Sequence, residues 1–186
     1  MTKQALRAVI AAEVKALDSE YCRTADAAIC RAVTDSELYR NARTVFCYIG
    51  TDREIDTKAL LTAALADGKR LALPLCVGKG IMEAREIRSL DDLVNGKYDI
   101  PAPAASCPIV EPEEFDLVIV PCSTGNEKGQ RLGYGGGFYD RYLGKTRCPK
   151  VLLCRKRLVK EEIPVEEHDL RMDCLATEDG IVTCIK

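Results

Sequence analysis

The chain has 186 residues and a mass of 20.5 kDa, with 47% hydrophobic and 30% charged residues and a net charge of −2. This composition is typical of a globular protein and excludes a disordered or fibrous chain. No apolar run approaches the ~18 residues of a membrane span, and residues 1–7 lack the apolar centre of a signal peptide. We therefore expect a single cytoplasmic domain over residues 1–186, monomeric and without membrane contact.

Ten cysteines are many for this length, but their spacing is not that of a zinc site. There is no C-x-x-C pair, and the only histidine is His168. A zinc site would place several Cys and His residues at short spacings. Several cysteines instead stand in apolar runs, where a free thiol behaves as a small hydrophobic group. We predict that all ten are reduced: Cys22, Cys30, Cys47, Cys76, Cys107, Cys122, Cys148, Cys154, Cys174 and Cys184.

The first third of the chain predicts two helices and then an alternation of strands and helices. Apolar residues from Ala5 to Leu17 recur at helical spacing, while Lys3 and Arg7 share another face. Asp18 or Ser19 is expected to cap a second helix. The later elements are a strand over 44–49, a helix over 57–66 capped by Asp56 or Thr57 and stopped by Gly68, and a strand over 70–75 that ends in Pro74.

The remaining two thirds continue the same alternation. We expect strands over 81–87, 115–121, 150–154 and 181–185, and short helices over 90–94 and 139–143. The run 115–121 is apolar apart from Asp116, as in a buried parallel strand. A proline-rich stretch over 99–112 is too short to divide two domains. Strands separated by helices predict a three-layer α/β/α fold with an open, largely parallel sheet, Rossmann-like in class.

A glycine-rich loop follows the run 115–121 and leads into a helix. Five of the 13 glycines lie between Gly129 and Gly137. Open α/β sheets bind ligands at this end of a strand, and glycines let backbone N–H groups approach phosphates closely. Arg131 and Arg141 add positive charge. The loop is not a Walker loop and does not complete a dinucleotide fingerprint, so we predict another phosphate-binding loop, with a plain tight turn as the alternative.

The charges are unevenly distributed along the chain. Residues 128–157 contain nine Lys/Arg and one acid, Asp140, whereas residues 158–186 contain eight acids and three bases. A basic excess attracts an anion, although the two stretches could also neutralise each other. Asp140 and Asp169 are candidate magnesium ligands beside phosphates, with an ion pair from Asp140 to Arg131 or Arg141 as the alternative. Aromatics make up 5% of the chain and tryptophan is absent, which disfavours nucleic-acid binding.

Residues 131–141, Arg-Leu-Gly-Tyr-Gly-Gly-Gly-Phe-Tyr-Asp-Arg, resemble the 5-formyltetrahydrofolate cyclo-ligase (methenyltetrahydrofolate synthetase) family. The likeness runs nearly end to end, with supporting matches at Lys3, Arg7, Glu54–Thr57, Gly68-Lys69, Leu73-Pro74, Ile100-Pro101, Ile163-Pro164 and His168-Asp169. It implies an ATP-dependent ligase that phosphorylates the formyl oxygen of 5-formyltetrahydrofolate and closes the ring by attack of N10. The products would be 5,10-methenyltetrahydrofolate, ADP and phosphate. A non-catalytic nucleotide- or folate-binding homologue is the alternative.

The resemblance also implies roles for individual residues. Lys3 and Arg131 are the expected catalytic residues, and Asp140 and Asp169 the expected Mg²⁺ ligands. The expected ATP site comprises Lys3, Arg7, Arg131, Leu132, Gly133, Tyr134, Gly135, Gly136, Gly137, Phe138 and Tyr139. The expected folate site, in which Glu54 would accept pterin N–H groups, comprises Ile49, Glu54, Tyr98, Tyr134, Gly135, Gly136, Gly137 and Phe138. The implied partners are therefore small molecules alone.

Two segments depart from the family's pattern. Asn126 stands before the glycine loop where the family usually has an aspartate, which removes a charge near the expected phosphates. The basic triplet 155–157 stands where the family tends to have an aromatic residue and a glutamine. The triplet leads us to predict a preference for polyglutamated folate.

Overall fold

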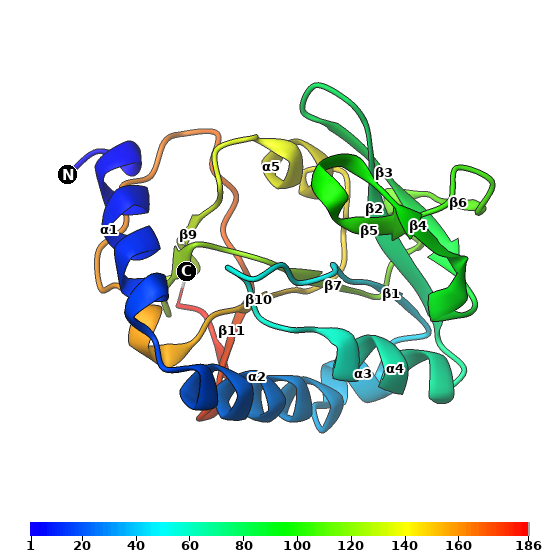
Figure 1. Ribbon diagram of the computed structural model, residues 1–186, viewed down its shortest axis with the longest axis horizontal. Coiled ribbons are helices and arrows are strands. Elements are labelled where there is room, and N and C mark those ends of the chain that lie inside the picture. Colours follow the sequence, from blue (N-terminus) through cyan, green and yellow to red (C-terminus); the bar gives the residue numbers. More distant parts are fainter. Residues whose placement is uncertain (186) are drawn as a thin grey trace.

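The computed structural model describes residues 1–185, apart from the side chain of Tyr98, and contains one large sheet (Figure 1). Its strands are β1 (Thr44–Phe46), β2 (Arg70–Gly78), β3 (Ile81–Ile87), β6 (Ile109–Val110), β7 (Leu117–Val120), β10 (Lys150–Leu153), β11 (Cys174–Thr177) and β12 (Gly180–Thr183). They follow the order β12-β11-β10-β7-β1-β2-β3-β6. The strands from β11 to β2 are parallel, and β12, β3 and β6 add antiparallel edges. The predicted α/β fold with a largely parallel sheet is thus confirmed.

Two small ladders accompany the sheet. One pairs β4 (Leu93–Asn95) with β5 (Pro101–Pro103), and the other pairs β8 (Thr124–Gly125) with β9 (Arg131–Leu132). The second ladder encloses the turn that precedes the glycine loop. It therefore connects the carboxyl end of β7 to that loop.

The structure describes five α-helices, and the first three begin at a capping side chain. They are α1 (Lys3–Ala16), α2 (Ser19–Thr34), α3 (Glu37–Asn41), α4 (Lys58–Ala66) and α5 (Phe138–Leu143). The Asp18 carboxylate accepts the first amides of α2, as predicted, and the Ser36 hydroxyl accepts an amide of α3. Such caps satisfy the free N–H groups of a helix start. Helix α3 was not predicted.

The helices cover the two faces of the sheet unequally. Helices α2, α3 and α4 pack on one face, where Ile29 and Leu60 belong to the same buried cluster as Ile119 of β7. Helix α5 and irregular segments cover the other face. Helix α1 lies beyond the end of the sheet, opposite β2 and β3 (Figure 1), and its buried residues Leu6 and Ile10 contact a separate small cluster. Helices therefore cover less of the sheet on the α5 side than on the α2 side.

Several predicted boundaries were wrong. Strand β2 does not end at Pro74 but runs to Gly78. It pairs with β1 only through Arg70–Ala72 and afterwards only with β3, and a strand with one free edge tolerates proline. The helix expected over 90–94 is a 3₁₀ turn followed by β4, β11 was not predicted, and the last strand ends at Thr183.

Within residues 1–185, no helix is both long and apolar enough to cross a membrane. All ten cysteines are free.

Candidate active site

The candidate site lies where β1 and β7 end, next to α1. A cavity of about 290 Å³ is lined by several α1 residues, by Arg53 in the loop after β1, by Ser123 after β7 and by Tyr134 in the glycine loop. The carboxyl ends of parallel strands share one edge of a sheet, so segments that are distant in sequence converge there. The cavity therefore joins three of the sequence segments expected to bind ligands.

The glycine loop presents its backbone to solvent. Gly135 and Gly137 have φ angles of 98° and 67°, a left-handed conformation that disfavours other residues. Tyr134, Gly135 and Gly136 are exposed, and a Cβ at Gly135 would lie 3.5 Å from the Arg7 guanidinium carbon. The loop thus leaves room for a ligand directly beside a positive charge.

Arg131 holds the two ends of the glycine loop together. Its Nε donates to the Pro121 carbonyl at 2.9 Å, and its Nη1 lies 3.3 and 3.4 Å from the two Asp140 oxygens. The guanidinium also lies over the Tyr139 ring, 5.3 Å from its centroid. The side chain is only 5% exposed, so a buried cation is fixed beside the loop. The ion pair between Asp140 and Arg131, considered above as the alternative role of Asp140, is present.

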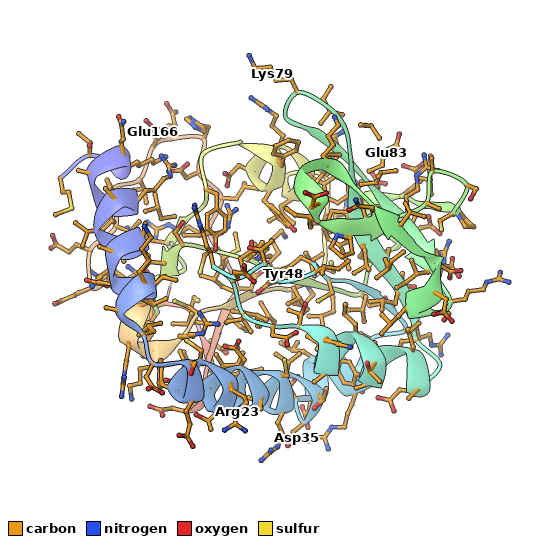
Figure 2. The ribbon with its side chains drawn as sticks, viewed as in Figure 1. Arg23, Asp35, Tyr48, Lys79, Glu83 and Glu166 are labelled. Carbon is orange, nitrogen blue, oxygen red and sulfur yellow. The ribbon has the colours of Figure 1, made fainter. Side chains whose placement is uncertain are left out.

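Helix α1 brings two further cations to the site. Arg7 Nε donates to the Gly133 carbonyl at 2.8 Å. Lys3 Nζ donates to both Asp169 oxygens, at 2.8 and 2.6 Å, and to Glu166 at 2.7 Å; Figure 2 labels Glu166 beside the start of α1. Partial burial raises the pKa of Asp169, but hydrogen bonds from Lys3 and from the Glu166 amide outweigh it and hold that pKa below its usual value.

The two predicted metal ligands have different partners. Asp140 keeps long contacts to Arg131 and is 27% exposed, so its oxygens remain available to a cation. Asp169 has short bonds to Lys3 and groups with Glu166 and His168, whose potential ligand atoms lie within 4.8 Å of one another. Carboxylate oxygens are the ligands that Mg²⁺ prefers. The Asp140 oxygens suit a Mg²⁺ ion in their present position. The Asp169 oxygens suit one only if Lys3 turns away.

The loop after β1 carries Glu54. Its carboxylate accepts the Thr51 amide at 3.0 Å, and burial raises its pKa, although the Thr51 hydrogen bonds partly offset that effect. The neck of the loop is tight, because a Cβ at Gly50 would lie 1.9 Å from the Ile55 carbonyl oxygen. Glu54, the residue expected to accept pterin N–H groups, is thus a partly buried carboxylate in a loop whose two ends lie close together.

Thr57 closes the neck of this loop rather than capping α4. Its side chain makes no capping hydrogen bond. The hydroxyl instead donates to the Tyr48 carbonyl at 2.6 Å and accepts the Gly50 amide at 3.2 Å. Tyr48 is labelled near the middle of the molecule in Figure 2. Asp56, the other expected cap, accepts the Lys58 amide at 2.9 Å.

The other predicted ligand contacts vary in exposure. Leu132 is 1% exposed and packs with Leu6 and Ile10 of α1, so its side chain supports that helix. Ile49 packs against the core on the α2 side, and Phe138 and Tyr139 against the core on the α5 side. The Tyr134 hydroxyl donates to the Cys122 carbonyl at 2.9 Å. The side chain of Tyr98 lies outside the described part of the structure.

The two departures from the family pattern have structural roles. Asn126 is buried and closes the turn between β8 and β9: its Oδ1 accepts the amides of Lys128 and Gln130. Each residue of the basic triplet contacts another residue of this chain. Arg155 pairs with Asp26, Lys156 with Asp179, and Arg157 lies over the Tyr21 ring.

Sequence reasoning missed Arg53 and Ser123 of the cavity. Both follow the ends of neighbouring parallel strands, a signal that could have identified them. It also missed the Arg141 Nη1 contact, at 3.3 Å, with the Gly80 carbonyl between β2 and β3. That contact connects α5 to an element 61 residues earlier, and no local pattern indicates it.

Comparisons with known proteins show the family of the chain. The model of the 5-formyltetrahydrofolate cyclo-ligase family matches residues 1–178. The chain is 28% identical to 5-formyltetrahydrofolate cyclo-ligase of Saccharomyces cerevisiae, over 97% of both chains, and 32% identical to that of Escherichia coli K12, over 75% of this chain and 80% of the relative. The NMR structure of Aquifex aeolicus 5,10-methenyltetrahydrofolate synthetase superposes with a TM-score of 0.88 at 26% identity, covering 100% of this chain and 94% of that one. The chain therefore belongs to the 5-formyltetrahydrofolate cyclo-ligase family.

Proposed function

We propose that this protein is an ATP-dependent ligase that closes 5-formyltetrahydrofolate to 5,10-methenyltetrahydrofolate. One observation supports this most directly: a single cavity is lined by α1, by the glycine loop and by the segments that follow β1 and β7. These segments carry the residues expected for both substrates. A nucleotide and a folate would therefore meet at the carboxyl edge of the sheet.

The reaction requires activation of the formyl oxygen, which is a poor leaving group. The γ-phosphoryl group of ATP passes to that oxygen, and ADP leaves. N10 then attacks the formyl carbon, the carbon–oxygen bond breaks, and phosphate departs while N10 loses its proton. Phosphoryl transfer depends mainly on positioning and on stabilising negative charge. Fixed cations beside an exposed backbone loop suit this task.

The proposed ATP site is built around the glycine loop. Arg131 is held in place by the Pro121 carbonyl, so it would stay beside the transferred phosphoryl group when Asp140 turns to the metal ion. Arg7 is positioned by the Gly133 carbonyl. Lys3 would turn from Asp169 toward the phosphates. We assign the catalytic roles to Arg131 and Lys3, and nucleotide contacts also to Arg7 and residues 132–139.

The proposed folate site lies on the other side of the same loop. Glu54 would accept N–H groups of the pterin ring, with Ile49, Tyr98 and residues 134–138 as further contacts. Burial and the nearby Glu54 charge raise the pKa of Tyr139, which supports a position of this carboxylate near the glycine loop. An ionised acceptor in a partly buried loop suits the donor edge of a pterin.

We propose that Mg²⁺ is held by Asp140 and Asp169. When bound, the ion would neutralise charge on the nucleotide phosphates. Asp140 would exchange its long contact with Arg131 for the cation. Asp169 would become available when Lys3 moves to the phosphates, which links release of this carboxylate to nucleotide binding.

We infer that residues 1–186 act as one monomeric, cytoplasmic domain whose partners are small molecules. The free cysteines support a reducing compartment. Three cations of the basic stretch, Arg131, Arg155 and Lys156, already pair with acids of the chain, so we propose no nucleic-acid partner. Asn126 is used in a turn, so its substitution for an aspartate does not argue for a non-catalytic homologue.

The test measures turnover and ATP binding separately for Asp140→Ala. Formation of methenyltetrahydrofolate is followed by its absorbance, and ATP binding by calorimetry with and without Mg²⁺. We expect turnover to fall at least ~100-fold while the fold is retained, because charge stabilisation at one phosphate contact is of this order. Asp91→Ala, at an exposed acid outside the site, is the control. If Asp140→Ala turns over at the rate of the wild-type protein, the metal assignment is wrong. If the wild-type protein forms no methenyl product, the proposed function is wrong.

A further inference from the structure

A buried ion pair contacts the backbone of the loop that carries Glu54. Arg155 Nε and Nη2 donate to the two oxygens of Asp26 at 2.7 and 2.8 Å. The two side chains are 5% and 8% exposed. Asp26 lies on α2 and Arg155 follows β10, so residues 129 positions apart are joined by a forked pair. Such a pair has well-defined geometry because a guanidinium and a carboxylate are both planar.

The pair also holds the backbone of the loop after β1. Arg155 Nη2 donates to the Glu54 carbonyl at 2.9 Å, and Asp26 Oδ2 accepts the Asp56 amide at 2.9 Å. The two hydrogen bonds flank Ile55, whose side chain is buried. The ion pair thus holds the loop backbone at two positions, Glu54 and Asp56.

Few other contacts determine how Glu54 is oriented. The neighbouring Asp52 and Arg53 are exposed, and residues 50–57 form turns and irregular backbone rather than a helix or strand. The hydrogen bond from the Thr51 amide to the Glu54 carboxylate is local to the loop. The ion pair connects this loop to α2 and to the end of β10, and the Cys30 thiol of α2 adds a weaker contact to the Asp56 carbonyl at 3.5 Å.

We propose that Arg155, held by Asp26, is a positioning residue for the folate site: it fixes the backbone at Glu54 and thereby the direction of its carboxylate. This rests on the proposed function, in which Glu54 binds the pterin ring. Arg155, the buried member of the basic triplet, would therefore contribute to folate recognition from within the fold.

The pair holds neither α1 nor the glycine loop, so its removal should affect the two substrates differently. We expect Asp26→Leu/Arg155→Met to raise the KM for 5-formyltetrahydrofolate about tenfold and to leave the KM for ATP within about twofold, as for loss of one well-oriented polar contact. Removing both charges together avoids an unpaired buried charge. Arg155→Lys keeps a charge for Asp26 but loses the fork, and it decides the question if the double variant does not fold.

The matched control is Arg23→Gln, which removes an exposed cation of α2 that pairs with Glu20 on the surface. It should leave both KM values unchanged. Equal rises in the folate and ATP KM values of the pair variants would indicate a general structural effect and overturn the inference. So would an unchanged folate KM in both the double variant and Arg155→Lys.

Glu54→Gln separates this inference from the proposed function. If Glu54→Gln leaves folate affinity unchanged, measured as a Kd by equilibrium dialysis without ATP, the proposed folate site is wrong. If it weakens folate binding and the pair variants do not, only the inference is wrong. If Arg155 acts through Glu54, adding Glu54→Gln to the double variant produces little further loss, whereas additive losses contradict the inference.

Discussion

Replacing Thr57 with valine tests whether its hydroxyl closes the neck of the Glu54 loop. Valine keeps the shape of the side chain but removes the donor to the Tyr48 carbonyl and the acceptor for the Gly50 amide. Thr57 is 0% exposed, so water does not replace these partners. Each unpaired buried group costs about 1–3 kcal/mol, and both together lower the free energy of unfolding by about 4 kcal/mol. At about 3 °C per kcal/mol for a chain of this size, we expect Tm to fall by about 12 °C.

Thr57→Ser is the matched control, because it keeps the hydroxyl and removes only a methyl group. Its expected cost is about 1 kcal/mol, or about 3 °C in Tm. Thermal unfolding followed by circular dichroism or calorimetry gives both values under the same conditions. If the two variants melt within about 3 °C of each other, the hydroxyl does not hold the loop and the reasoning is refuted.

Three further predictions concern the site itself. Lys3→Met should raise the KM for ATP about tenfold to a hundredfold, since a charged hydrogen bond is lost; steady-state kinetics at saturating folate measures this, and an unchanged ATP KM contradicts the assignment. Gly137→Ala and Gly68→Ala both place alanine at positive φ, 67° and 69°, so both should lower Tm by about 3–6 °C, but only Gly137→Ala should weaken ATP binding. Because folding raises the pKa of Glu54 above its usual 4.5, the protonated carboxyl stabilises the fold at low pH and that contribution is lost as the pH rises through its pKa. Folate binding should strengthen over the same rise, and Glu54→Gln should abolish this dependence.

The glycine loop could be predicted because its signal is local. Five glycines follow an apolar strand and precede a helix, and the three exposed loop residues, Tyr134, Gly135 and Gly136, are all among those expected to bind ligands. The order of strands and helices was accessible for the same reason. Boundaries were less so: Pro74 was expected to end a strand, but the neighbouring strand β1 ends first and leaves one edge of β2 free.

The Arg131–Asp140 pair, nine residues apart, could be considered from the sequence. The pairs of Lys3 with Asp169 and of Arg155 with Asp26 could not, because their partners are far apart in the sequence. Arg155 was expected to face a ligand as part of a basic triplet, whereas its partner Asp26 lies on α2 and both are buried. A count of charged residues along the sequence treats each basic residue as exposed, because it does not show a buried partner. The turn role of Asn126 was hidden in the same way, since the family comparison suggested a lost charge and the structure shows a buried amide with several hydrogen bonds.

The contact between Lys3 and Asp169 spans 166 residues. During synthesis, the proposed ATP site therefore cannot form this contact until residue 169 has left the ribosome. Nascent chains released before residue 169 would retain the glycine loop and much of the sheet but would lack this closing contact. Assembly of the proposed site consequently depends on two segments that are synthesised far apart in time.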